Sequence, residues 1–378
     1  MSAIKIFLGI FTFLIMLHEP QMIYNAAAFA LETWWNSVLP ALLPFFIVSE
    51  FLMAVGLMDC LALWLEPVMR PLFRLSGGSA LAMVMGFVSG TPTAANITAI
   101  LYKQKLCSKD EAERLLAFTN NAGPLYILAA VAVGIFQNPA VGILLFLSHY
   151  PINLLFGFLL RFFAKDSRPP TDPSPHLFTA GLRQLFNKPL PPFGSLLASV
   201  VKKALRNIGV VGGFMVVFGI LTAAFDIAGI TALLAHLLSP FAALFAIDPA
   251  CLSALAAGFW EMTIGIAVLP QANADLLSML LATSAILAWQ GISIQSQVAA
   301  MVADTDLSLA KYRLCRLIHG FLAPLTVFFL YKKTAPVFAA VKTGAVSSYS
   351  FLSPMGLLLC GLGTILLIAC IGMLISKK

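Results

Sequence analysis

The chain has 378 residues, of which 60% are hydrophobic and only 10% are charged. Because soluble domains average about 25% charged residues, this composition excludes a soluble globular enzyme, a disordered protein and a nucleic-acid-binding protein. At about 20 apolar residues per spanning helix, it predicts an all-α polytopic membrane protein with about eight to ten hydrophobic elements. Lys and Arg outnumber Asp and Glu by 23 to 16, an excess that we assign to cytoplasmic loops.

Residues 1–30 are predicted to form an N-terminal membrane helix that is retained rather than cleaved as a secretion signal. The apolar run stops at His18, Glu19 and Pro20. Proline lacks the N–H group that a continuous helix uses, so we expect the helix to be broken or tilted there.

Two diverged copies of one repeat, residues 31–163 and 204–335, are predicted on either side of a Pro-rich linker, 164–203. Each copy has a long apolar helix, a shorter segment with a central proline, two polar interruptions and a closing apolar helix. The apolar helices are expected at 34–57, 141–163, 205–225 and 317–331. The basic linker is expected in the cytoplasm, and residues 336–378 are expected to form a C-terminal transmembrane helix.

The first interruption is a polar turn whose candidate binding residues are Thr91, Pro92, Thr93 and Asn96. Pro92 lacks an N–H group and disfavours helix at Thr91, so backbone carbonyls become free nearby. The threonine hydroxyls can replace the lost partners. The alternative is that these side chains only satisfy the kink.

A second interruption follows about 30 residues later at Asn120 and Asn121. Carboxamides both donate and accept hydrogen bonds, which suits a polar ligand; a loop cap is the alternative. Polar interruptions at equivalent places in two repeats indicate a transporter's central site, because irregular backbone persists in hydrocarbon only where it lines a cavity or is covered by protein.

Glu261 stands in the second copy's first interruption and is the only charge in the apolar segment 254–269. Ionisable groups at such depth usually mark a transport pathway. We therefore interpret Glu261 as a coupling or gating residue, with a structural hydrogen bond as the alternative. Its neighbour Thr263 is a candidate for substrate binding.

The second copy's other interruption contains the candidate binding residues Gln290, Ser293 and Gln297. Ser293 shares a helix face with each of the two glutamines. We expect that face to point away from lipid.

Two charged segments, 103–114 and 304–316, mix both signs and are predicted to be amphipathic surface helices with solvated charges. The apolar spans offer no clear Arg or Lys to neutralise a buried anion, and Arg70 and Arg74 come nearest. The histidines and cysteines show no metal-ligand spacing. We expect no catalytic residue, no metal and no cofactor.

The four interruptions also carry a family pattern, which reads GFVSGTPTAANI, FTNNAGPLYI, GFWEMTIG and WQGISIQSQ. Over roughly residues 30–335, this pattern resembles the YlbJ type of sporulation integral membrane proteins, which have the nucleoside-recognition gate domain and are similar to concentrative nucleoside transporters. The resemblance implies two inverted repeats with re-entrant helical hairpins, whose turns fall near residues 91–93 and 263–265.

The resemblance implies secondary transport of a small organic anion, dipicolinate, from the mother cell toward the forespore, across the outer forespore membrane. Two alternatives stay open: a carrier of nucleosides or related heterocycles, and a non-transporting protein of spore cortex assembly. The expected partners are a small-molecule substrate and the lipid bilayer, with no nucleic acid. The coupling ion, H+ or Na+, and a homo-oligomeric state are left open.

Overall fold

The computed structural model describes residues 2–57, 64–65, 69–76, 78–164 and 189–342. Within these ranges the chain is helical and has no strand, which confirms the all-α prediction. In the described part of the chain, five helices are long and apolar enough to cross a membrane: Pro20–Ala54, Pro139–Phe163, Phe193–Ile227, Leu276–Met301 and Ala310–Lys333. Three predicted features lie outside the described residues: the C-terminal helix, most of the linker, and Pro67, the central proline of the shorter segment in the first copy.

The chain begins with α1 (Ser2–His18) and α2 (Pro20–Thr33), which are separated at Glu19. The predicted break is therefore present, with Pro20 in the first turn of α2, where its missing N–H costs no hydrogen bond. A π-helical turn, η1 (Trp34–Val38), joins α2 to α3 (Leu39–Ala54).

The rest of the first half consists of a helical hairpin, a broken helix and a closing helix. The hairpin is α5 (Ser79–Ser89) and α6 (Thr93–Lys103). The broken helix is α7 (Lys109–Thr119) followed by the π-helical η2 (Tyr126–Ile135). The closing helix is α8 (Pro139–Leu160), extended by one short turn, η3 (Arg161–Phe163).

The second half repeats this order after two apolar helices, α10 (Phe193–Ile227) and α11 (Ile230–Leu244). Its hairpin comprises η4 (Pro249–Cys251), α12 (Leu252–Trp260), α13 (Met262–Val268) and η5 (Leu269–Gln271). Its broken helix comprises α14 (Leu276–Trp289) and α15 (Gly291–Met301), and its closing helix is α16 (Ala310–Lys342). Because α10 already begins at Phe193, the last part of the range assigned to the linker is helical.

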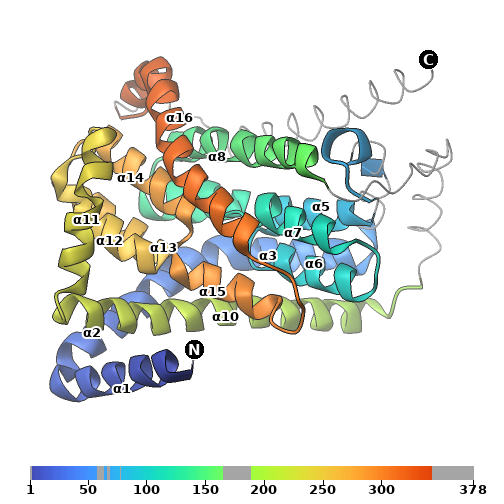
Figure 1. The fold of residues 1–378 in the computed structure, drawn as a ribbon, viewed down its shortest axis with the longest axis horizontal. Helices are drawn as coiled ribbons and strands as arrows, with labels where there is room; N and C mark the ends of the chain where they lie inside the picture. Colours follow the sequence, from blue (N-terminus) through green and yellow to red (C-terminus); the bar gives the residue numbers. More distant parts are fainter. Residues whose placement is uncertain (1, 58–63, 66–68, 77, 165–188, 343–378) are drawn as a thin grey trace.

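Two helices, α16 and α10, hold the two halves together. Figure 1 shows α16 crossing the molecule obliquely, where it packs against α14, α8 and α7. The long α10 packs against α2 and α3, so second-half helices contact first-half helices on both sides. The broken helices contact these two helices, with α7 and α14 against α16 and α15 against α10.

A charged network joins the α6–α7 turn of the first half to the α15–α16 connection of the second. Asp306 accepts hydrogen bonds from the Tyr102 hydroxyl at 2.6 Å and from Lys109 at 2.8 Å. In repeat order, the α6–α7 turn corresponds to the α13–α14 connection, not to α15–α16. In inverted repeats, the α6–α7 turn and the α13–α14 connection lie on opposite membrane faces. Because α14 and α15 together form one candidate span, the α15–α16 connection then lies on the same face as the α6–α7 turn. The observed pairing of these two connections therefore agrees with inverted repeats.

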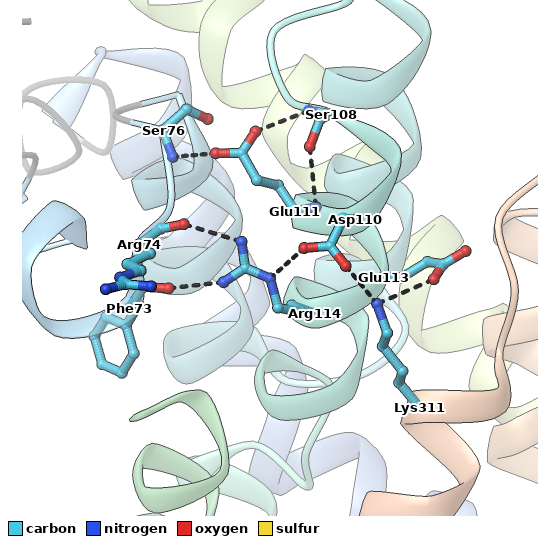
Figure 2. A network of polar contacts seen from close by, with 9 residues as sticks. All are labelled: Phe73, Arg74, Ser76, Ser108, Asp110, Glu111, Glu113, Arg114 and Lys311. Atoms are coloured by element: carbon cyan, nitrogen blue, oxygen red, sulfur yellow. Dashed lines mark hydrogen bonds and ion pairs between the residues drawn. The ribbon is translucent and has the colours of Figure 1, made fainter. Parts of the chain in front are cut away.

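The charges of segments 103–114 and 304–316 are not all solvated, which corrects the sequence prediction. Figure 2 shows Arg114 donating to Asp110 at 2.8 Å and to the carbonyls of Phe73 and Arg74 at 2.8 and 2.9 Å. Lys311 pairs with Asp110 at 2.7 Å. We call the following residues the rim network: Lys109, Asp110, Glu113, Arg114, Asp306 and Lys311.

Candidate functional site

The two interruptions of the first half contact each other directly. Gly90 has a left-handed φ of +71°, and a Cβ built there would lie 2.5 Å from the Gly123 nitrogen, so only glycine fits. The Thr91 N–H and hydroxyl both donate to the Asn121 carbonyl, at 3.0 and 3.3 Å. The hairpin turn is thereby fixed against the break between α7 and η2.

The second half brings its two interruptions together in the same way. Gly291 has a φ of +68°, and a Cβ built there would lie 3.0 Å from the Trp260 carbonyl. The Trp289 indole donates to the Phe259 carbonyl at 3.1 Å. The α14–α15 break therefore rests on the α12–α13 break.

Glu261 is the residue at which α12 ends and α13 begins. Its carboxylate accepts the Ile264 N–H at 2.7 Å, so it caps α13, and it is only 1% exposed. The break falls at Glu261, two residues before the turn position expected at Thr263. Thr263 lies in the first turn of α13, where its hydroxyl accepts a hydrogen bond from Tyr126 of η2 at 3.1 Å.

Several buried side chains at the breaks have polar atoms without a partner. They are Asn120 Oδ1, both side-chain polar atoms of Asn121, Gln290 Nε2, Ser293 Oγ and Gln297 Oε1. Each of these residues is at most 2% exposed. A buried, unsatisfied polar group costs about 1–3 kcal/mol, and such groups need a ligand or water as partner. We call these five residues the break cluster.

The remaining predicted residues lie at the edge of this region. Thr91, Pro92 and Thr93 are half-buried at the first hairpin turn, and Asn96 is exposed on α6. Asn96 is thus not brought together with the break cluster.

Sequence reasoning missed a buried arginine. Arg316 was assigned to a solvated segment, but it lies in α16 with 0% exposure. Its Nη2 donates to Asn153 Oδ1 of α8 at 2.5 Å and to the Ala117 carbonyl of α7 at 3.3 Å. One turn earlier on α16, the Tyr312 hydroxyl donates to Gln290 Oε1 at 2.9 Å. Arg316 therefore adjoins both broken helices.

Two buried histidines accompany this arginine. The rings of His149 on α8 and His319 on α16 meet edge to face, with centroids 4.8 Å apart. His149 Nε2 and both ring nitrogens of His319 have no hydrogen-bond partner. We call Arg316, His149, His319 and Asn153 the arginine–histidine cluster. The signal available in the sequence was polar residues at helical spacing, i and i+3 or i+4, inside apolar helices.

No metal centre accompanies these groups. Among the described residues, no three or more His, Cys, Asp or Glu side chains gather as metal ligands would. The site instead offers amides, hydroxyls, two imidazoles and one guanidinium.

A family model and a curated protein match the sequence of this chain. The nucleoside recognition family (Gate) matches residues 35–148. The sporulation integral membrane protein YlbJ of Bacillus subtilis (strain 168) is 34% identical over 325 residues, which span 84% of this chain and 79% of that protein.

Solved structures give the fold. A CNTnw variant in its intermediate 2 state aligns with a TM-score of 0.53 and 15% identity, over 78% of this chain and 76% of that one. CNTnw in an inward-facing, substrate-bound state aligns with a TM-score of 0.50 and 14% identity, over 86% and 85% of the two chains. The chain therefore has the fold of a concentrative nucleoside transporter.

Proposed function

The chain belongs to the YlbJ family of sporulation integral membrane proteins, and we propose that it is a secondary transporter of a small organic anion. Dipicolinate is the proposed substrate, moved from the mother cell toward the forespore across the outer forespore membrane. No catalytic step is involved in this function.

The observation that carries the proposal is the pairing of interrupted helices around unpartnered polar atoms. Transporters built from inverted repeats bind their substrates where discontinuous helices meet near the bilayer midplane. Within each half, the break of the hairpin packs against the break of the broken helix. Asn120, Asn121 and Ser293 at these breaks keep buried polar atoms without partners. A bound polar substrate would supply these partners.

The arrangement is closed in this structure, since the break cluster is shielded from solvent. Transport therefore requires the halves to move relative to each other, as alternating access demands. We assign Glu261 to coupling or gating, because its buried carboxylate sits at the break between α12 and α13. An H+ or Na+ gradient would drive the movement.

A nucleoside or related heterocycle is the second candidate substrate. It is favoured by the match of residues 35–148 to the nucleoside recognition family and by the uncharged amides of the break cluster. Glu261 could then contact a neutral substrate without charge repulsion.

Transport into proteoliposomes separates these candidates. Purified protein is reconstituted, and uptake of radiolabelled dipicolinate and uridine is followed under imposed H+ and Na+ gradients, with protein-free liposomes as control. Saturable dipicolinate uptake, inhibited by unlabelled dipicolinate and not by uridine, is expected. Saturable uridine uptake alone would replace the first proposal by the second, and uptake of neither would leave a non-transporting role in spore envelope assembly.

A further inference from the structure

We propose that the arginine–histidine cluster is the receptor for a carboxylate of the transported anion, with Arg316 as its charged member. The inference rests on the proposed function for the identity of the ligand. It assigns the charge neutralisation to α16 and α8, outside the interrupted helices.

The first argument is the uncompensated charge of Arg316. A guanidinium stays protonated in proteins, and burying an unpaired charge costs several kcal/mol. Yet the ion pairs found over residues 2–57, 64–65, 69–76, 78–164 and 189–342 do not include Arg316. Its contacts to Asn153 and to the Ala117 carbonyl are neutral and use only Nη2, so the N–H groups at Nε and Nη1 have no partner.

Arg114 shows how this chain buries an arginine for structure alone. It is 1% exposed, yet each of its three nitrogens donates a hydrogen bond, and Asp110 neutralises its charge at 2.8 Å (Figure 2). Arg316 is equally buried but lacks both the acidic partner and the full set of acceptors. The difference points to an acidic partner that comes from outside the chain.

The other residues of the arginine–histidine cluster are two histidines and an asparagine, so none of its residues is acidic. His319 follows Arg316 by one turn on α16, and His149 precedes Asn153 by one turn on α8, where Asn153 Nδ2 donates to the His149 carbonyl at 2.8 Å. The groups packed around them are aromatic, with the Phe156 ring 5.9 Å from that of His319 and the Tyr312 ring 5.9 Å from the guanidinium carbon. Imidazole N–H groups donate to carboxylates, and charge-assisted bonds from arginine to a carboxylate are about twice as strong as neutral ones.

The cluster also adjoins the break cluster. The carbonyl that Arg316 contacts belongs to Ala117, one turn before Asn120, and Tyr312 links α16 to Gln290. An anion held by Arg316 would therefore lie beside both broken helices.

Ligand binding to the full-length protein in detergent tests this assignment. Calorimetric titration and the ligand-induced rise in Tm are measured with pyridine-2,6-dicarboxylate and with its neutral diamide. The variants are Arg316→Met and Arg316→Lys, and Arg313→Met is the matched control, since Arg313 is exposed on the same helix. We expect Arg316→Met to weaken dicarboxylate binding at least tenfold and Arg316→Lys by an intermediate factor, with Arg313→Met unchanged.

The stability of the unliganded protein distinguishes a receptor from a structural arginine. A receptor role predicts that Arg316→Met lowers the Tm without ligand no more than Asn153→Leu does, because removal of an uncompensated charge offsets the loss of the hydrogen bonds to Asn153 and Ala117. A structural role predicts a larger fall in Tm and an unchanged dicarboxylate affinity. If Arg316→Met does not fold, the dicarboxylate affinity is compared with Arg316→Lys instead, which keeps the charge and loses the planar donors, and a fall in affinity of less than twofold would overturn the receptor.

The outcomes separate this inference from the proposed function. Dicarboxylate binding by Arg316→Met within twofold of the unmodified chain would overturn the receptor, while transport by both proteins would leave the function intact. Arg316-dependent binding without transport in proteoliposomes would support the receptor and refute the function. Binding of the diamide as tightly as the dicarboxylate would also overturn the receptor, since no charge would then be recognised.

Discussion

Tyr126 donates a 3.1 Å hydrogen bond to Thr263, and this contact links the broken helix of the first half to the hairpin of the second. Both side chains are buried, at 7% and 3% exposure. In a transporter that works by relative movement of its halves, such a bond stabilises one arrangement over the other.

Tyr126→Phe removes this bond and should lower the stability by about 1 kcal/mol, the usual net value of a buried hydrogen bond. Thr263→Val should cost a similar amount, and the double variant should lose less than the sum because both changes remove one interaction. Thermal unfolding in detergent measures the cycle.

Tyr150→Phe is the matched control, because the Tyr150 hydroxyl donates to the Ala122 carbonyl at 3.2 Å within the first half. Its effect should add to that of Thr263→Val. Additivity in the Tyr126 cycle as well would show that the bond does not join the halves in solution.

Glu261→Gln should retain the fold, because the amide oxygen can still accept the Ile264 N–H and cap α13. If Glu261 couples transport to an ion, the variant should lose the gradient dependence and the pH dependence of uptake while its Tm stays within a few degrees. Glu261→Ala should lose the cap as well, at a cost of about 1 kcal/mol. Unchanged uptake and pH dependence in Glu261→Gln would restrict Glu261 to capping.

Asn121→Leu should affect stability and transport in opposite directions. Neither side-chain polar atom of Asn121 has a partner, so an apolar side chain of similar volume should leave the Tm unchanged or raise it. Transport should nevertheless fall at least tenfold, because a substrate partner is lost. A fall of Tm and transport together would indicate a structural amide.

Asn153→Leu is the informative contrast, since that amide donates to the His149 carbonyl at 2.8 Å and accepts from Arg316. It should destabilise the protein by about 1–3 kcal/mol. A neutral effect on Tm would show that the Asn153 contacts are not formed.

The rim network should make stability fall at acidic pH. Burial alone would raise the pKa of Asp110, but the Lys311 hydrogen bond and the Arg114 charge outweigh burial and hold the pKa below its usual value. A carboxylate with a lowered folded-state pKa stabilises the protein above the unfolded value, about 3.9. That stabilisation disappears as pH falls through the lower folded-state pKa.

In Asp110→Asn, the Tm should therefore fall less than in the unmodified chain as the pH is lowered. The Tm at pH 7 should also be lower, because Arg114 keeps its charge without a partner. Asp304→Asn is the control, since Asp304 forms only an exposed pair with Lys103 at 3.6 Å, worth about 0–1 kcal/mol. An equal fall of Tm at acidic pH in the two variants would contradict the role of Asp110.

The positions of the interruptions were predictable because glycine and proline act through local backbone chemistry. Pro92 lies between α5 and α6, Gly123 and Pro124 lie between α7 and η2, and Gly291 begins α15 directly after the break. The break at Glu261 contains neither residue type, and there the expected turn position was two residues late. The packing of one break on another follows from the duplication, which is also visible in the sequence.

Arg316 could not be placed from its neighbours. Lys311 and Arg313 are nearby charges with at least partial exposure, so local composition indicates a solvated helix. Its burial is decided by α7 and α8, whose contact residues are 199 and 163 positions away in the chain. The helical spacing of polar residues on α8 and α16 marks a shared face, but the elements that cover that face are distant in the chain.

The length of α10 helps to place the rim network on one side of the membrane. Its 35 residues extend roughly 50 Å at 1.5 Å per residue, well beyond a hydrocarbon layer of about 30 Å. The exposed Lys202, Lys203 and Arg206 occupy its N-terminal part, at the same end of the long axis as the α6–α7 turn in Figure 1. A cytoplasmic linker would therefore place the rim network at the cytoplasmic surface of the membrane, where its exposed ion pairs are screened by the salt of the cytosol.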